Sequence, residues 1–231
     1  MSGDCCITIN SVLAKLGGVK MSTYILTSMF PNGFMQVANV FQQKIEKRDK
    51  FAFVASEFEA LHEKTDKYFY IFLDMFESAG IHFEEAYVVD GRMNAAEAQK
   101  AVAEADVVWL SGGDTPTQFG YFVKYGLVEI LQEHQGVIIG MSAGSINMAR
   151  TSVCTLSCGH RKQEIFNGLG CVDVSVEPHF VRDHVSDELI ELSKDYIIYG
   201  LCDDAIIVCS GETIEFYGEV YKLSQGIVER V

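Results

Sequence analysis

The sequence predicts an α/β fold, with one sheet of mainly parallel strands and helices on both of its faces. Short strand-like runs alternate with longer amphipathic segments along most of the chain, and repeated β-α units form parallel sheets with right-handed crossovers. One run, Val137 to Ile139, is wholly β-branched and bounded by glycines, as expected for a strand buried on both faces. With 20 glycines and 3 prolines, the chain suits many tight turns, and its 231 residues suffice for one sizeable core.

The first half of the chain supplies the alternation. Strands are expected at residues 24–28, 51–55, 83–89 and 107–110, which are short and rich in β-branched or aromatic side chains. Helices are expected at residues 33–47 and 59–79, where apolar side chains recur at helical spacing. A third helix is expected at residues 95–104, since Asn94 can cap its first turn. The apolar stripe of the second helix is interpreted as core rather than as a ligand pocket.

The second half begins with a fifth strand at residues 137–141. Residues 151–170 then show a looser pattern, to which we assign no element. Valines alternate with polar residues at 172–176, which indicates a strand, and residues 187–194 are expected to be helical. Later strands and hairpins of the same domain are expected at residues 196–199, 205–209, 213–217 and 220–223. Residues 1–20 differ in pattern from the rest of the chain, so we interpret them as an extension or leader and place a single domain at residues 21–231.

Charge and composition exclude several classes of function. The formal net charge of −14 makes nucleic acid and anionic membranes poor partners. No apolar run reaches the roughly 18 residues that a membrane span needs. Seven cysteines in a chain of this size indicate reduced thiols and a cytoplasmic location. Cys154, Cys158 and His160 lie close in sequence, but no second pair with ligand spacing accompanies them, so we expect no metal site.

Ser142 stands in the pattern Gly-x-Ser-x-Gly, directly after the fifth strand. This is the sequence form of a nucleophile elbow, in which a sharp strand-to-helix turn exposes a serine hydroxyl. Gly140 and Gly144 leave room where the backbone passes close to itself. Such a turn also points the backbone N–H of Ala143 at the group that Ser142 attacks. The pentapeptide alone fits a turn without chemistry equally well.

A second glycine turn, Gly112-Gly113, follows the fourth strand and precedes Asp114. In a parallel sheet this turn would lie beside the elbow, because sites gather at the carboxyl ends of the strands. The amides of Gly113 and Ala143 could then form an oxyanion hole, which stabilises the negative charge that develops in acyl transfer. An ordinary strand-to-helix turn remains an alternative, whereas phosphate binding lacks the lysine of a P-loop.

His179 is the candidate base. It follows Pro178 at the end of the strand at residues 172–176, and a serine nucleophile needs such a base. His184 is a nearby competitor, and a capped surface histidine is the alternative interpretation of His179 itself.

Together these segments resemble the peptidase E (aspartyl dipeptidase) family of serine peptidases, which includes cyanophycinase-like enzymes. The resemblance covers residues 23–218. The matching motifs are Leu26-Thr27-Ser28, Leu110-Ser111-Gly112-Gly113-Asp114-Thr115, Gly140-Met141-Ser142-Ala143-Gly144-Ser145, and Gly168-Leu169-Gly170 followed by Pro178-His179-Phe180. The resemblance implies a three-layer α/β/α fold related to class I glutamine amidotransferases.

The resemblance also implies a Ser-His-acid order, unlike the Ser-acid-His order of α/β-hydrolases. The family's acid, typically glutamate, matches Asp203 here, with Asp204 as the close competitor. The family arginine that binds a substrate aspartyl group falls at Ser193, so Arg182 or Lys194 would have to replace it.

The expected function is therefore hydrolysis of short peptides, dipeptidase-like and with an N-terminal aspartate as one possible preference. Ser142, His179 and Asp203 are the expected catalytic residues, Gly113 and Ala143 form the oxyanion hole, and Asp114 and Arg182 contact substrate. No cofactor or metal is expected, and the chain would act as a monomer or homodimer. The alternatives are a cyanophycinase-like isopeptidase and a non-catalytic relative that binds a small molecule.

Overall fold

The computed structural model describes residues 22–231. The interpretation of residues 1–20 as an extension or leader falls outside this part of the chain and stays a prediction. The main sheet has seven strands in the order β11-β10-β1-β5-β4-β2-β3. Its parallel strands are β1 (Thr23–Thr27), β5 (Val137–Met141), β4 (Val107–Leu110), β2 (Lys50–Val54) and β3 (Glu85–Val89).

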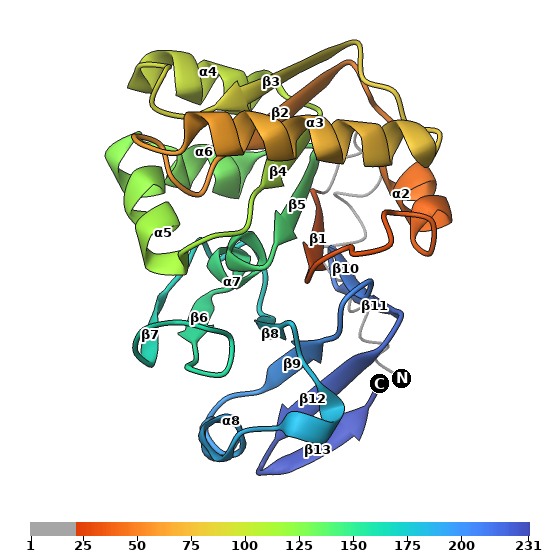
Figure 1. The fold of residues 1–231 in the computed structure, drawn as a ribbon, viewed down its shortest axis with the longest axis vertical. Coiled ribbons are helices and arrows are strands. Elements are labelled where there is room, and N and C mark those ends of the chain that lie inside the picture. Colours follow the sequence, from red (N-terminus) through yellow and green to blue (C-terminus); the bar gives the residue numbers. More distant parts are fainter. Residues whose placement is uncertain (1–21) are drawn as a thin grey trace, which may run out of the picture.

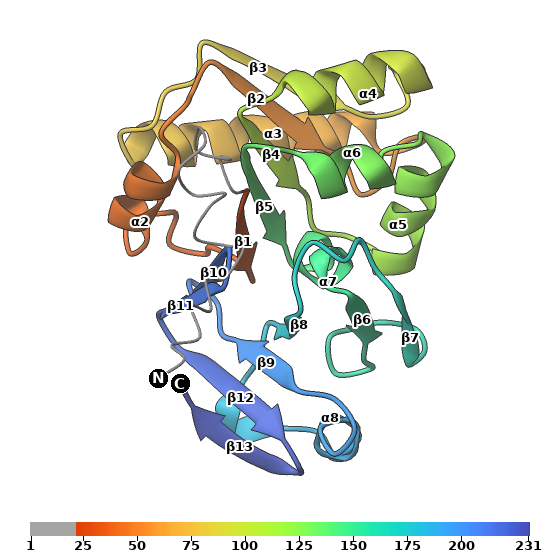
Figure 2. The same ribbon diagram turned by 180° about the vertical axis from the view of Figure 1, so that it is seen from behind.

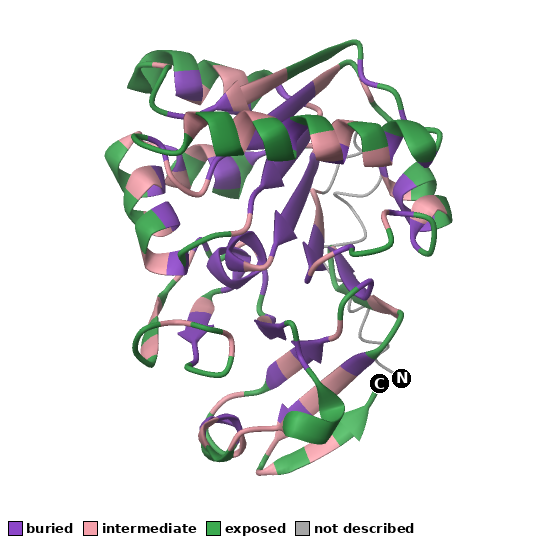
Figure 3. Ribbon diagram, viewed as in Figure 1, coloured by how far each residue is buried: buried purple, intermediate pink, exposed green. Residues whose placement is uncertain are grey.

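Helices cover both faces of this sheet, which confirms the predicted layers. Figure 1 shows α3 (His62–Ser78) across one face, and Figure 2 shows α4 (Ala95–Glu104) and α6 (Val128–Glu133) on the other. Helix α2 (Ala38–Lys44) packs with α3, and α5 (Thr115–Lys124) and α7 (Ala143–Met148) pack on the opposite side. Each face of the sheet has its own apolar core: the first lies under α2 and α3, and the second under α4 to α7. In strand β4, Val107 and Trp109 face the first core, while Val108 and Leu110 face the second. The internal strands β4 and β5 are accordingly buried along their whole length (Figure 3).

The first core is aromatic. Trp109 is fully buried and lies with its ring 4.5 Å from that of Phe72. Phe72 and Phe76 of α3 belong to the stripe that the sequence assigns to the core, and both are buried there.

The predicted helix at residues 33–47 is shorter than expected, because residues 31–37 form turns and α2 begins only at Ala38.

The loosely patterned segment at residues 151–170 contains a short antiparallel pair. Strand β6 (Thr151–Cys154) pairs with β7 (Glu164–Asn167), and the connecting loop is held largely by side chains. Strands of four residues with little alternation give almost no periodic signal, which is why the sequence did not reveal them.

The last third of the chain divides between two sheets. Strands β10 (Ile206–Ser210) and β11 (Thr213–Tyr217) extend the main sheet in the antiparallel direction. A four-stranded sheet contains β8 (Ser175–Pro178), β9 (Ile198–Leu201), β12 (Val220–Ser224) and β13 (Ile227–Arg230), the last of which was not predicted. Helix α8 (Asp187–Leu192) connects β8 to β9 and follows a 3-10 turn, η1 (Arg182–His184). This smaller sheet lies below the main one in Figure 1.

Candidate active site

Ser142 occupies a strained turn between β5 and α7. Its φ of 50° and ψ of −108° lie in a region that non-glycine residues rarely adopt. The flanking glycines are required for space. A Cβ on Gly144 would lie 2.2 Å from the carbonyl oxygen of Leu110, and one on Gly140 would lie 2.6 Å from the nitrogen of Ser145. Ser142 thus stands in a tight, strained strand-to-helix turn that only glycine neighbours allow.

The imidazole of His179 faces this serine. Its Nε2 lies 3.0 Å from the Ser142 hydroxyl oxygen, within hydrogen-bond reach. His179 follows β8 with a φ of 56°, and its own backbone N–H donates to the Ser28 hydroxyl at 2.8 Å. The competing histidine, His184, is exposed on η1. Geometry therefore brings together Ser142 and His179.

Asp203, not Asp204, faces the other nitrogen of this imidazole. The Oδ1 of Asp203 lies 3.2 Å from His179 Nδ1. Asp204 points away, because its amide donates to the Met29 carbonyl and its Oδ2 accepts a hydrogen bond from Asn32 at 2.9 Å. The replacement of the family's glutamate by the shorter aspartate is thus compatible with contact to the histidine.

Strand pairing explains why these residues meet. Strands β1 and β5 are parallel, with Thr27 opposite Met141, so Ser28 and Ser142 both lie just beyond the same edge. Strands β8 and β9 are also parallel, with Pro178 opposite Leu201, so His179 and Asp203 emerge side by side.

Ser28 is a residue for which sequence reasoning predicted no role. It is fully buried, donates to Asp203 Oδ1 at 2.7 Å, and lies 3.4 Å from His179 Nδ1. Together with the bond from the His179 amide, these contacts fix the carboxylate and the imidazole relative to each other. Its position just after a short strand parallel to the elbow strand was the available signal.

The glycine turn after β4 lies beside the elbow, as the sequence predicts. A Cβ on Gly112 would lie 3.4 Å from Ser142 Cβ, and one on Gly113 would lie 2.2 Å from the Ser56 hydroxyl oxygen. The N–H groups of Gly113 and Ala143 have no acceptor among residues 22–231. These two amides are therefore available to an incoming oxygen.

Two buried amide side chains hold this turn against the elbow helix. Gln118 of α5 donates to the Ser111 carbonyl at 2.9 Å, and Asn147 of α7 donates to the Thr115 carbonyl and to Gln118 Oε1, each at 3.0 Å. The two backbone segments that carry the free amides are thus fixed relative to each other.

Comparison with known proteins identifies the family of this chain. The sequence model of peptidase family S51 matches residues 27–217. The chain belongs to peptidase family S51. Membership of this family makes the chain a peptidase. No curated protein matches it.

Solved structures with the same fold share little sequence with this S51 member. One is a peptidase from an acI-B1 Actinobacterium, with a TM-score of 0.66 and 17% identity over 92% of this chain and 95% of that one. Another is a protein assigned as a peptidase E from Listeria monocytogenes EGD-e, with a TM-score of 0.60 and 17% identity over 91% and 99% of the two chains. Both confirm the predicted peptidase E-like fold.

A cavity of about 880 Å³ opens beside Ser142 and His179 in this S51 fold. Its volume lies within the range of about 300–1,000 Å³ that is usual for small-molecule sites. One wall comes from α3 and the loop before it, with Leu61, Lys64 and Tyr68. Another wall comes from the β6–β7 loop, where three basic residues lie in succession: His160, Arg161 and Lys162.

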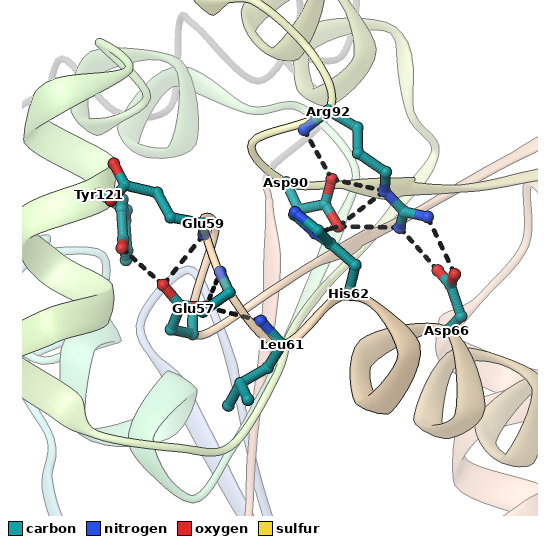
Figure 4. Close-up of polar contacts among 9 residues, drawn as sticks. Glu57, Glu59, Leu61, His62, Asp66, Asp90, Arg92 and Tyr121 are labelled. Atoms are coloured by element: carbon teal, nitrogen blue, oxygen red, sulfur yellow. Dashed lines mark hydrogen bonds and ion pairs between the residues drawn. The ribbon is translucent and has the colours of Figure 1, made fainter.

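The beginning of α3 is held from its other side by an ionic network, drawn in Figure 4. Arg92 binds Asp66 at 2.6 Å and the buried Asp90 at 2.8 Å, and His62 Nδ1 lies 3.1 Å from Asp90. Burial raises the pKa of Asp90, but the hydrogen bonds from Arg92 and His62 outweigh it and lower the pKa overall. His62 and Asp66 are one turn apart, so Lys64 is presented on a different face, toward the cavity.

Glu57 fixes the loop that leads into α3 (Figure 4). Its carboxylate accepts hydrogen bonds from the backbone amides of residues 59–61 and from the Tyr121 hydroxyl at 2.7 Å. Burial raises the pKa of Glu57, but these hydrogen bonds prevail and lower it to about 2. Glu57 is thus ionised at any ordinary pH, and Leu61 is held at the cavity wall.

The predicted substrate contacts divide in the structure. Asp114 lines the cavity and also caps α5, accepting from the Thr117 amide at 3.0 Å, which lowers its pKa. Arg182 is exposed on η1 and does not line the cavity, so its contact with substrate is a prediction without geometric support. Ser193 is buried, and Lys194 pairs with Glu191 away from the cavity.

The cysteines and histidine that were weighed as metal ligands have other partners. His160 Nε2 lies 2.9 Å from the Thr115 hydroxyl and its Nδ1 lies 3.1 Å from the Thr155 carbonyl. Burial raises the pKa of Cys154 to about 12. Within residues 22–231, no group of three or more His, Cys, Asp or Glu could hold a metal ion. None of the helices in this range is both long and apolar enough to cross a membrane.

Proposed function

We propose that this S51 member is a serine-type peptidase that hydrolyses short peptides through Ser142, His179 and Asp203. The observation that carries the proposal is the continuous line of contacts from Asp203 to His179 at 3.2 Å and from His179 to Ser142 at 3.0 Å. An imidazole between a serine hydroxyl and a carboxylate is the arrangement by which unrelated folds activate serine.

The contacts assign a role to each group. Ser142 Oγ attacks the scissile carbonyl carbon while His179 Nε2 takes its proton, and His179 then gives that proton to the leaving amine. Asp203 accepts the Nδ1–H of His179 and stabilises the imidazolium without taking the proton itself. The Gly113 and Ala143 amides donate to the oxygen that becomes negative. Water then attacks the acyl-enzyme by the same route and releases the acid product.

The charges around the cavity favour peptides with an acidic residue, which supports the predicted preference for an N-terminal aspartate. Lys64 and Arg161 line the cavity and form no ion pair within the described part of the chain. The acidic residues of the cavity wall all have partners: Glu57 and Asp114 bind backbone amides, and Glu164 pairs with Lys162 at 3.1 Å. Asp114 carries the negative charge that suits a substrate α-amino group. The cytoplasmic location stays a prediction.

A serine-reactive phosphonate tests the nucleophile directly, because it bonds covalently only to an activated hydroxyl. We expect a single adduct per chain, located at Ser142 by peptide mapping. In parallel, a library of dipeptides, tripeptides and β-aspartyl isopeptides would identify the substrate. No adduct and no turnover would favour a non-catalytic binding protein, and turnover of β-aspartyl-arginine alone would favour the cyanophycinase-like alternative.

The pair Asp203→Asn and Asp204→Asn tests the acid. We expect Asp203→Asn to lower kcat by about 10²- to 10⁴-fold, because an amide no longer holds His179 in the productive tautomer. Asp204→Asn is the matched control, since asparagine tolerates the φ of 64° at that position. Its kcat should stay within about tenfold of wild type. The reverse ranking in steady-state kinetics would assign the acid to Asp204.

A further inference from the structure

Glu177 is a buried carboxylate that the proposed mechanism does not use. It lies on β8, two residues before His179, and is only 3% exposed. Both of its oxygens are 2.8 Å from the Thr155 hydroxyl, and its Oε1 accepts from the Ser157 hydroxyl at 2.7 Å. Burying a carboxylate costs free energy unless hydrogen bonds compensate for the lost water, and here the Thr155 and Ser157 hydroxyls provide those bonds.

The partners of Glu177 organise the β6–β7 loop. The Thr155 hydroxyl accepts from the Cys158 amide at 3.0 Å, and the Thr155 carbonyl accepts from the His160 amide at 3.2 Å. His160 Nδ1 lies 3.1 Å from the same carbonyl. One threonine bound to Glu177 therefore fixes both the turn of the loop and the ring of a cavity residue.

This loop forms the basic wall of the cavity, through His160, Arg161 and Lys162. The strand that carries Glu177 ends in Pro178 and is followed by His179. The Cys158 thiol of the loop also donates to the Pro178 carbonyl at 3.6 Å, but Glu177 is the only carboxylate among the described residues that joins this loop to β8. The basic wall and the candidate base are positioned relative to each other through it.

We propose that Glu177 is a positioning residue for peptide hydrolysis, whose carboxylate ties the basic wall of the cavity to the strand that leads to His179. This inference rests on the proposed function for its kinetic consequence. Its structural part, the tie between Glu177 and residues 155–160, stands on the contacts alone.

The tie is sensitive to pH near neutrality. Burial raises the pKa of Glu177 to about 7, against the hydrogen bonds from Ser157 and Thr155, and the charge of Glu188 on α8 raises it further. The other titratable groups that face Glu177 are the thiols of Cys154 and Cys158, whose pKa values burial raises well above neutrality. Above pH 7 the ionised carboxylate accepts from both hydroxyls, whereas the protonated form must use one oxygen as a donor. The hydrogen bonds to the loop are therefore stronger in the ionised form, whereas burial makes that form less favourable for the folded chain as a whole.

The variants Glu177→Gln and Glu188→Gln separate positioning from mere stability. Glu188 is the matched control, because its carboxylate also binds this loop, through the Leu156 amide at 3.0 Å, but without full burial. At about pH 8 we expect Glu177→Gln to raise KM about tenfold with kcat within about threefold, since one charged hydrogen bond to the wall is lost. Wild type should show a KM that falls as pH rises through about 7, an inflection that Glu177→Gln lacks and Glu188→Gln shifts downward.

Amide hydrogen exchange provides a readout that does not need activity. We expect the amides of residues 156–160 to exchange at least about tenfold faster in Glu177→Gln than in wild type at about pH 8. Unchanged exchange, or a pH-independent KM in wild type, would overturn the proposal. If wild type hydrolyses no peptide at all, the proposed function fails, and exchange alone then decides whether Glu177 ties the loop.

Thermal stability adds an independent sign. The raised pKa means that the unfolded chain ionises Glu177 first, so wild type loses stability as pH rises from about 4.5 to about 7. Glu177→Gln lacks this penalty and should melt above wild type at about pH 8, with the difference vanishing below about pH 4.5. A difference independent of pH would show that Glu177 is not the group that titrates.

Discussion

Ser142→Ala is expected to lower kcat for peptide hydrolysis by about 10⁴- to 10⁶-fold, the loss typical when a serine nucleophile is removed. The substitution removes only the hydroxyl that lies 3.0 Å from His179 Nε2. Alanine takes up the same backbone strain as serine, so melting temperature and circular dichroism should remain close to those of wild type. Initial rates on the best library peptide, with burst-phase kinetics for the acyl-enzyme, provide the measurement.

Ser56→Ala is the matched control for this experiment. Ser56 also lines the cavity beside Gly113, but it forms no hydrogen bond with His179. Its kcat should stay within about tenfold of wild type. Equal losses in Ser56→Ala and Ser142→Ala, or full activity in Ser142→Ala, would remove Ser142 from the nucleophile's role.

Gly144→Ala is expected to destabilise the fold by about 3 kcal/mol or more, because overpacking of a fixed site has no cheap relaxation. The new Cβ would lie 2.2 Å from the carbonyl oxygen and 2.8 Å from the carbonyl carbon of Leu110. Both are backbone atoms of β4, an internal strand of the sheet, and cannot move aside as a flexible side chain would. Urea denaturation measures the change.

Gly120→Ala is the opposite case on the neighbouring helix. A Cβ there meets nothing within 4 Å, and Gly120 lies inside α5. Alanine should stabilise the helix by about 0.5–1 kcal/mol, because it restricts the unfolded chain more than glycine does. Insoluble Gly144→Ala protein, with Gly120→Ala still soluble, would support the need for space at residue 144 as well as a measured loss of stability does. Wild-type stability in Gly144→Ala would mean that α7 does not pack closely against β4.

The elbow, the second glycine turn and the histidine could be predicted because each has a local signal. Ser142 and Gly113 follow strongly apolar strands, and His179 follows a valine alternation, so the parallel sheet alone places two of the three at one edge. The acid could not be chosen this way. Asp203 and Asp204 are adjacent in sequence, and the choice depends on the Met29 carbonyl and Asn32, which draw Asp204 away.

The cavity wall was beyond local signals altogether. Lys64 lies on a helix interpreted as core, and Arg161 lies in a segment without periodicity. They line one cavity because the tertiary structure places their elements side by side. Arg92 binds Asp66 of α3, and Ser157 of the β6–β7 loop donates to Glu177. Arg182, weighed as a replacement for the family's arginine, is exposed on η1 and does not line the cavity.

The sequence by itself therefore determined the α/β fold, the S51 family and the position of Ser142 in a turn directly after a strand, since each rests on periodicity or on residues that are neighbours in the chain. Only the tertiary structure decided which carboxylate faces His179 and which cations line the cavity. It also decided that Ser28 contacts both His179 and Asp203. The physical reason is strand pairing. The parallel pair β1–β5 aligns Ser28 with Ser142, and the parallel pair β8–β9 aligns His179 with Asp203. The antiparallel pair β1–β10, with Thr27 opposite Ile206, then brings Ser28 close to Asp203, 175 positions away, and no single segment of the sequence contains this register.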